Sequence, residues 1–208
     1  MGGFNTLVKN FADATCEMHL TSPSGLPVYG VQKADGSVDV ALGEWVDTGE
    51  TAVVGIDKFG VEIRDAIMEA KAPTVDADAT INPSNLALRS MSSPDAKRFR
   101  DERKCDINPI DMLTVIQGRK LYETVKDEEG VTKEVEKVLK EEDMRVFWAS
   151  LIADFINLPY EDDKGQTTLS TYSEDNALDF VKLMPGIVFQ MKEIVFDPKK
   201  FERSTNSG

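Results

Sequence analysis

Apolar and polar residues alternate along the first third of the chain with the period of two that is typical of half-buried β-strands. Residues 16–20 show this alternation, and residues 28–31 form a second apolar run. Asp35 and Gly36 then favour a hairpin turn because both accept positive φ at low cost, and residues 37–42 alternate again. The pattern predicts a small antiparallel sheet. It leaves open an extension of that sheet through Trp45, Val53 and Val54.

From about Asp57 the apolar residues recur at helical spacing, with charged residues on the other side. The apolar positions are Phe59, Ile63, Ala66, Ile67 and Ala70, and the charged ones are Glu62, Arg64, Asp65 and Glu69. We therefore predict one helix packed on the sheet, within a β-rich N-terminal subdomain at residues 1–71. Residues 72–84 contain Pro73, Pro83 and a polar tract, which predicts a connector.

Residues 85–156 predict three helices. The first covers residues 85–104 with an interruption near Pro94, and the second begins at Pro109 and ends at about residue 123. After a polar turn at residues 127–130, Thr132 is an N-cap candidate for a long helix through residue 156. This helix has the strongest apolar stripe in the chain, which consists of Trp148, Leu151, Ile152 and Phe155.

Two further helices are predicted near the end of the chain. Thr171 and Glu174 have the spacing of a capping box, and a last helix follows Pro185-Gly186 through residues 187–195. Residues 85–203 thus read as a helical subdomain, and residues 204–208 as a disordered tail. The predicted fold class is α+β, with a small N-terminal antiparallel sheet and a packed helix followed by a mostly helical C-terminal part.

Charge and cysteine content narrow the choice of partner and compartment. The net charge is −13 and acids outnumber bases in both halves, so we expect no nucleic-acid partner. No apolar run approaches the ~20 residues that cross a bilayer, so we expect no membrane partner. Cys16 and Cys105 are the only cysteines, and no segment resembles a secretion signal, which predicts a reducing compartment.

The sequence contains no motif that predicts an enzyme. G-x-S-x-G, a P-loop and a dinucleotide fingerprint are all missing, and a single histidine, His19, excludes a site with two histidine ligands. Acidic groups such as Asp76 with Asp78, and residues 161–163, favour solvated loops. We expect no catalytic site, no metal and no cofactor. A carboxylate enzyme stays as an alternative that would need a concave site with perturbed acids.

The last predicted helix carries large apolar residues on more than one side. Such a helix is either buried or docked to another chain, and the pattern leaves both readings open. The candidate protein-binding residues are Phe189, Met191, Phe196 and Phe201.

Several short segments resemble bacteriophage tail-morphogenesis proteins of the tail assembly chaperone type. The matching pieces are a strand and turn at residues 18–27, Asp57-Lys58-Phe59, Trp148 late in a long helix, residues 173–177, residues 184–187, Asp197 and Phe201. These pieces are spread over most of the chain.

The resemblance implies a non-enzymatic protein that holds tape-measure helices soluble in the host cell cytoplasm while tail-tube subunits polymerise. The alternative is a structural component of the virion, such as a completion or capsid-stabilising protein. The partner is then the tape-measure protein or another phage structural protein, and a homo-oligomer is left open. A chaperone would be absent from finished particles, whereas a structural component would be present in them.

Overall fold

The computed structural model describes residues 14–128, 130–161, 165–197 and 200–201. Of these residues 38% are strand and 26% are helix, arranged in several small sheets and five helices. The predicted mostly helical C-terminal part is therefore wrong. The tail at residues 204–208, predicted to be disordered, lies outside the described residues.

The chain divides into two compact units that interleave along the sequence. Unit 1 contains residues 1–16, 87–154 and 172–208, and unit 2 contains residues 17–86 and 155–171. A three-stranded sheet in the order β1-β7-β10 is built from β1 (Thr15–His19), β7 (Asn85–Arg89) and β10 (Ile152–Ile156). Along the chain, each of these strands begins in one unit and ends in the other.

Unit 2 contains the antiparallel sheet that the alternating pattern predicts. β2 (Val28–Gln32) lies between β3 (Val38–Leu42) and β6 (Thr80–Pro83), which confirms the two strands expected at residues 28–31 and 37–42. Tyr29 and Val31 are buried, and the core of this unit also includes Met18, Leu20, Val38 and Leu86.

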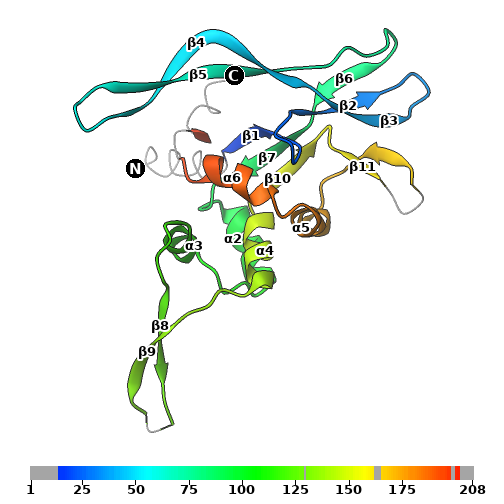
Figure 1. Cartoon of the computed structure of the whole chain (residues 1–208). Helices are drawn as coiled ribbons and strands as arrows, with labels where there is room; N and C mark the ends of the chain where they lie inside the picture. Colours follow the sequence, from blue (N-terminus) through cyan, green and yellow to red (C-terminus); the bar gives the residue numbers. More distant parts are fainter. Residues whose placement is uncertain (1–13, 129, 162–164, 198–199, 202–208) are drawn as a thin grey trace, which may run out of the picture. The chain divides into compact units, whose positions relative to one another are not determined.

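Two hairpins complete unit 2. β4 (Glu44–Ile56) pairs with β5 (Glu62–Lys71), and β11 (Pro159–Glu161) pairs with β12 (Thr167–Leu169), both antiparallel. The first is a long, twisted two-stranded ribbon, drawn in cyan (Figure 1). Close packing leaves no room for a side chain at Gly30, because a Cβ there would lie 2.8 Å from the Asn157 carbonyl oxygen.

Unit 1 contains the helices. They are α2 (Pro94–Glu102), α3 (Pro109–Ile116), α4 (Glu141–Ala149), α5 (Glu174–Leu183) and α6 (Ile187–Val195). Their apolar sides form a core in which Phe99, Phe147, Leu151, Ile187 and Met191 are fully buried. The starts expected at Pro109 and Ile187 are confirmed. The side chain of Ser173, one residue before α5, caps that helix by accepting a bond from the Asn176 N–H at 3.0 Å, so Thr171 is not the N-cap.

Charged side chains hold the helices of unit 1 together. Arg100 is buried and donates to the Ser150 hydroxyl at 3.1 Å and to the Met91 carbonyl at 3.2 Å. Arg103, the C-cap residue of α2, forms ion pairs with Glu174 at 2.7 Å and Asp175 at 3.2 Å, in the first turn of α5. Acids in a first turn also complement the positive end of the helix dipole.

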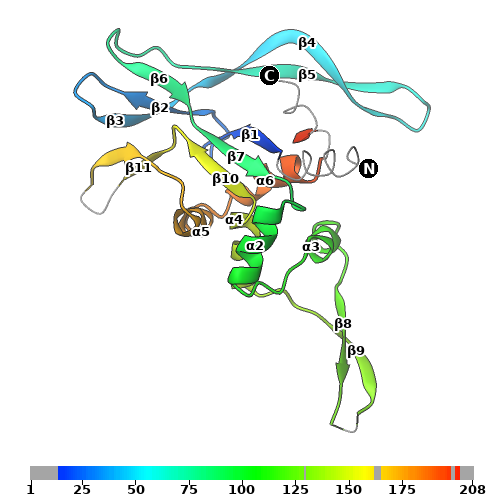
Figure 2. The same cartoon turned by 180° about the vertical axis from the view of Figure 1, so that it is seen from behind.

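A hairpin interrupts the helices of unit 1. β8 (Tyr122–Lys126) pairs with β9 (Thr132–Glu136), and the hairpin extends away from α2 and α4 (Figures 1 and 2). The helix predicted at residues 132–156 is therefore wrong, since that segment is β9, then α4, then β10. The helix predicted at residues 85–104 is likewise β7 followed by α2.

The helix predicted from Asp57 is also wrong, because residues 57–61 are a turn and β5 follows. The apolar spacing that suggests a helix is shared by a strand whose two faces are both partly apolar. Pairing of nine of the ten residues of β5 with β4 decides in favour of the strand. Local propensity is a weak constraint when a neighbouring strand offers a hydrogen-bond ladder.

One five-residue turn recurs at 22–26, 33–37, 57–61 and 127–131, the last of which includes residue 129 outside the described part of the chain. In each turn the first N–H donates to the fifth carbonyl, at 2.8, 2.9, 2.8 and 3.0 Å, and the fourth N–H donates to the first carbonyl. The fourth residue is always a glycine with positive φ, at 81°, 83°, 83° and 79°. Short hairpin loops often carry a glycine in the left-handed conformation at this position.

Candidate protein-binding ribbon

The β4–β5 ribbon, residues 44–71, is built on the third of these turns. The Asp57 carboxylate accepts hydrogen bonds from the N–H groups of Phe59 at 2.8 Å and Val61 at 2.9 Å, which fixes the tip. The register runs from Ile56 opposite Glu62 at the tip to Glu44 opposite Lys71 at the root. Two irregularities interrupt this ladder, and bulges of this kind increase the local twist.

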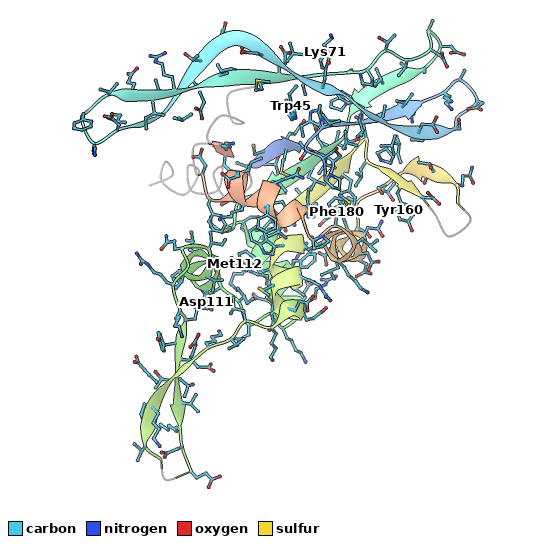
Figure 3. The ribbon with its side chains drawn as sticks, in the orientation of Figure 1. Trp45, Lys71, Asp111, Met112, Tyr160 and Phe180 are labelled. Atoms are coloured by element: carbon cyan, nitrogen blue, oxygen red, sulfur yellow. The ribbon has the colours of Figure 1, made fainter. Side chains whose placement is uncertain are left out.

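Aromatic contacts hold the root of the ribbon within unit 2. The Trp45 indole N–H donates to the Gly25 carbonyl at 2.7 Å, and its ring lies 6.2 Å from the His19 ring. His19 in turn meets Tyr29 edge-on at 5.1 Å. Figure 3 labels Trp45 and Lys71, which come from β4 and β5. Burial, and then the negative charge of Glu69, raise the pKa of Tyr29.

Gly43 lies where the chain passes from β3 into β4, and the packing there requires a residue without a side chain. A Cβ at this position would lie 2.3 Å from the Lys71 carbonyl oxygen and 2.7 Å from Tyr29 Cε2. The Gly43 N–H donates to the Pro27 carbonyl at 2.9 Å. The packing at Gly43 therefore fixes the point at which the chain leaves the β3-β2-β6 sheet and enters the ribbon.

Apolar side chains are exposed along most of the ribbon. They are Trp45, Val46, Val53, Val54, Ile56, Phe59, Val61, Ile63, Ile67 and Met68. At the tip Phe59 is 78% exposed, and the Lys58 ammonium lies 5.0 Å from the centre of its ring.

The register distributes these side chains over both faces of the ribbon. Residues opposite each other in an antiparallel pair share a face, and alternate residues along a strand change face. One face carries Trp45, Val53, Ile56 and Met68, and the other carries Val46, Ile63 and Ile67. A ribbon with one buried face would instead separate apolar from polar residues.

The ribbon is also acidic. Residues 44–71 hold seven acidic side chains against three basic ones, Lys58, Arg64 and Lys71. Two of the bases pair within the ribbon, Arg64 with Glu62 at 2.7 Å and Lys71 with Glu44 at 3.0 Å. The remaining acids surround the exposed apolar groups with negative charge.

The four candidate residues near the C-terminus lie in different environments. Met191 and Phe201 are buried, and Phe196 is half-buried with its ring 6.2 Å from the Trp148 ring. Phe189 is 74% exposed. The structure thus does not bring the four together on one surface, and their protein-binding role stays a prediction.

Unit 1 contains a cleft of about 350 Å³ that is lined by ionisable side chains. Arg100, Cys105 and Lys137 line it with other residues of the segment 91–137. Burial lowers the pKa of Arg100 and raises the pKa of Cys105, so the thiol is held in its less reactive protonated form. The positive charge of Arg100 lowers the pKa of the Cys105 thiol, but burial is the larger effect.

Among the described residues, His, Cys, Asp and Glu side chains form no group of three or more that could hold a metal ion. In the same residues, no helix is long and apolar enough to span a membrane.

The chain was compared with models of protein families, with curated proteins and with solved structures. No match was found in any of the three. The functional argument therefore rests on the geometry of the chain.

The sequence analysis missed the β4–β5 ribbon as a site because it assigned residues 57–70 to a helix. The spacing between the first residue and the glycine of each turn would have indicated a hairpin there. Asp57 and Gly60 stand three apart, as do Asp127 and Gly130, and as do Lys33 and Gly36 in the hairpin that was recognised.

Proposed function

We propose that this chain is a non-enzymatic assembly protein that binds a protein partner through the β4–β5 ribbon. The observation that supports this is the exposure of apolar side chains on both faces of a two-stranded ribbon. A two-stranded hairpin is at best marginally stable in water, and large exposed apolar patches mark interaction sites. A partner that covers the ribbon would both stabilise it and bury its apolar side chains.

The chemistry of the ribbon specifies the kind of partner. Seven acids against three bases favour a partner segment whose apolar groups are flanked by Lys or Arg. The β4–β5 pair forms a sheet of its own within the described residues, so its outer edges offer backbone donors and acceptors for strand addition.

The resemblance to bacteriophage tail-morphogenesis proteins supplies a proposed partner. In this proposal the ribbon covers apolar segments of the tape-measure protein in the host cell cytoplasm until tail-tube subunits replace it. The contact is then transient, and the chain acts as an assembly chaperone.

The second candidate function is a structural component of the virion. The outer edges of the ribbon favour it, because backbone hydrogen bonds to an added strand make a regular contact that persists in an assembled particle. The partner is then another phage structural protein.

Binding by the full chain to the tape-measure protein encoded in the same genome tests the ribbon. Val53→Thr with Met68→Thr alters one face, and Ile63→Thr with Ile67→Thr alters the other, while threonine keeps strand propensity. Because interface hot spots contribute ~2 kcal/mol or more, we expect at least one pair to weaken binding about thirtyfold in calorimetry.

Val40→Thr on β3 is the matched control, because it makes the same kind of exposed strand substitution outside both ribbons. We expect it to change affinity less than about threefold, which is within ~0.7 kcal/mol. Circular dichroism and urea unfolding must show that all variants fold. Unchanged binding in both ribbon pairs would refute the proposal. Mass spectrometry of purified particles then separates the two functions, since a structural component is present in fixed copy number.

A further inference from the structure

The β8–β9 ribbon spans residues 122–136. The sequence of its first strand, β8, is compatible with an antiparallel copy of itself. We propose that two copies of this chain pair antiparallel through the outer edge of β8, about a two-fold axis at Thr124. The product is one continuous four-stranded sheet in which the two β8 strands lie at the centre. This contact is independent of the β4–β5 ribbon and of the function proposed for it.

The hydrogen bonds of the ribbon define which backbone groups are available. The Asp127 N–H donates to the Val131 carbonyl and the Lys137 N–H donates to the Leu121 carbonyl, both at 3.0 Å. Residues 121 and 127 therefore face β9. Because donors and acceptors alternate sides along a strand, Tyr122, Thr124 and Lys126 present theirs to the outer edge. β8 and β9 form a two-stranded sheet in the described part of the chain, so this edge has no strand beside it there.

When all five residues of β8 pair with the β8 strand of a second copy, the side chains that lie opposite each other are compatible. Thr124 then lies opposite Thr124, Tyr122 opposite Lys126, and Glu123 opposite Val125. Threonine pairs and a lysine beside an aromatic ring are favourable across strands. No like charges oppose each other. The one acid and one base of β8 also balance, although the whole chain carries −13.

The equivalent pairing of β9 is unfavourable. Its five residues would put Glu134 opposite Glu134 at the axis, with Thr132 opposite Glu136. Two carboxylates directly opposite each other repel, and natural proteins use charges in this way to block the edge of a sheet. The edge of β8 can therefore pair with a second copy, whereas charge repulsion opposes the same pairing at the edge of β9.

The ribbon is suited to this contact in two other respects. Its ladder runs from Tyr122 opposite Glu136 to Lys126 opposite Thr132 without a register shift, so the edge carries no bulge. Its root is also fixed, because Lys137 forms ion pairs with Asp111 at 3.3 Å and Asp106 at 3.4 Å. A regular edge on a fixed root loses little freedom when it pairs.

Cysteine cross-linking of the full chain tests which edge pairs. In the proposed dimer the two Thr124 Cα atoms are about 5.5 Å apart, as in any hydrogen-bonded antiparallel pair, and this lies within disulfide range. We expect Thr124→Cys to give a covalent dimer under mild oxidation. Glu134→Cys, at the centre of the other edge, is the matched control and should give no covalent dimer. The unmodified chain, which keeps Cys16 and Cys105, gives the background.

Sedimentation equilibrium tests the register without a cross-link. Thr124→Glu places two like charges opposite each other at the axis and should weaken self-association at least about tenfold. Thr124→Val keeps a β-branched residue and should change it less than about threefold. The circular dichroism of both variants must match that of the unmodified chain. A chain that stays monomeric at its highest soluble concentration, or a dimer cross-linked through residue 134 instead, would overturn the proposal.

Discussion

The β4–β5 and β8–β9 ribbons end in the same five-residue turn, yet they present different surfaces. β4–β5 has exposed apolar groups on both faces, an acidic sequence and two irregularities in its ladder. β8–β9 exposes fewer apolar groups, which are Tyr122, Val125, Val131 and Val135, and it has a regular ladder and one strand whose charges balance. Aromatic contacts hold the root of the first ribbon, whereas ion pairs hold the root of the second. The turn determines that a hairpin forms, and the strands determine what it can bind.

The largest effect should come from Gly43→Ala, at the root of β4–β5. The added Cβ would lie 2.3 Å from the Lys71 carbonyl oxygen, so backbone must move. We expect the free energy of unfolding to fall by about 3 kcal/mol, measured by urea denaturation. Gly55→Ala is the control, because the nearest atom to its Cβ would be 4.0 Å away. Equal effects at the two glycines would mean that the root is not fixed in the way described.

The root of β8–β9 is tested by Lys137→Met. The Lys137 and Asp111 side chains are 19% and 18% exposed, and the variant would leave Asp111 without this partner. We expect a loss of about 1 to 1.5 kcal/mol at neutral pH, since the pair is partly screened by solvent. Lys120→Met is the control, because the Lys120–Glu136 pair is well exposed. Lys120→Met should lower the free energy of unfolding by much less than Lys137→Met.

The same pair predicts a pH dependence. Burial alone would lower the pKa of Lys137, but its hydrogen bond to Asp111 and the charges of Asp111 and Asp106 raise it above its ordinary value. A raised pKa stabilises the fold below the unfolded value, ~10.4, and that contribution is lost as pH rises through the folded value. The difference in stability between the unmodified chain and Lys137→Met should therefore shrink above about pH 10.4. A difference that grows with pH would contradict the sign.

The shared turn predicts equal losses in the two ribbons. Gly60 and Gly130 have φ of 83° and 79°, where alanine is strained and neither Cβ would meet another atom within 4 Å. We expect Gly60→Ala and Gly130→Ala each to cost about 1 kcal/mol in urea denaturation. A difference well above ~0.5 kcal/mol would show that the turns depend on their surroundings.

The smallest effect on stability is expected at the tip of β4–β5. Phe59 is 78% exposed, so Phe59→Ser should change the free energy of unfolding by less than about 0.5 kcal/mol. Under the proposed function the same variant weakens binding to the partner. A marked loss of stability would show that Phe59 packs within the chain instead of being available for a partner.

Parts of the fold could be predicted because local signals agreed with one another. Asp35-Gly36 and the alternation on either side predicted β2 and β3, and the apolar period with the Pro185-Gly186 stop predicted α5 and α6. The segment from residue 57 to 70 failed because Phe59, Ile63, Ala66, Ile67 and Ala70 fit a helix as well as a two-faced strand. The segment 132–156 failed because the apolar stripe from Trp148 to Phe155, which fits one helix, runs from the end of α4 into β10.

The sequence by itself determined the acidic charge, the positions of the turns and the residues able to end a hairpin, since these depend on single residues and their immediate neighbours. Only the tertiary structure decided which segments became ribbons and which edges stayed open. A strand acquires its hydrogen bonds from residues far along the chain, as β7 and β10 do within one sheet. Its apolar residues also have no defined face until those partners fix the register, so the exposed surface of β4–β5 appears only in the folded chain.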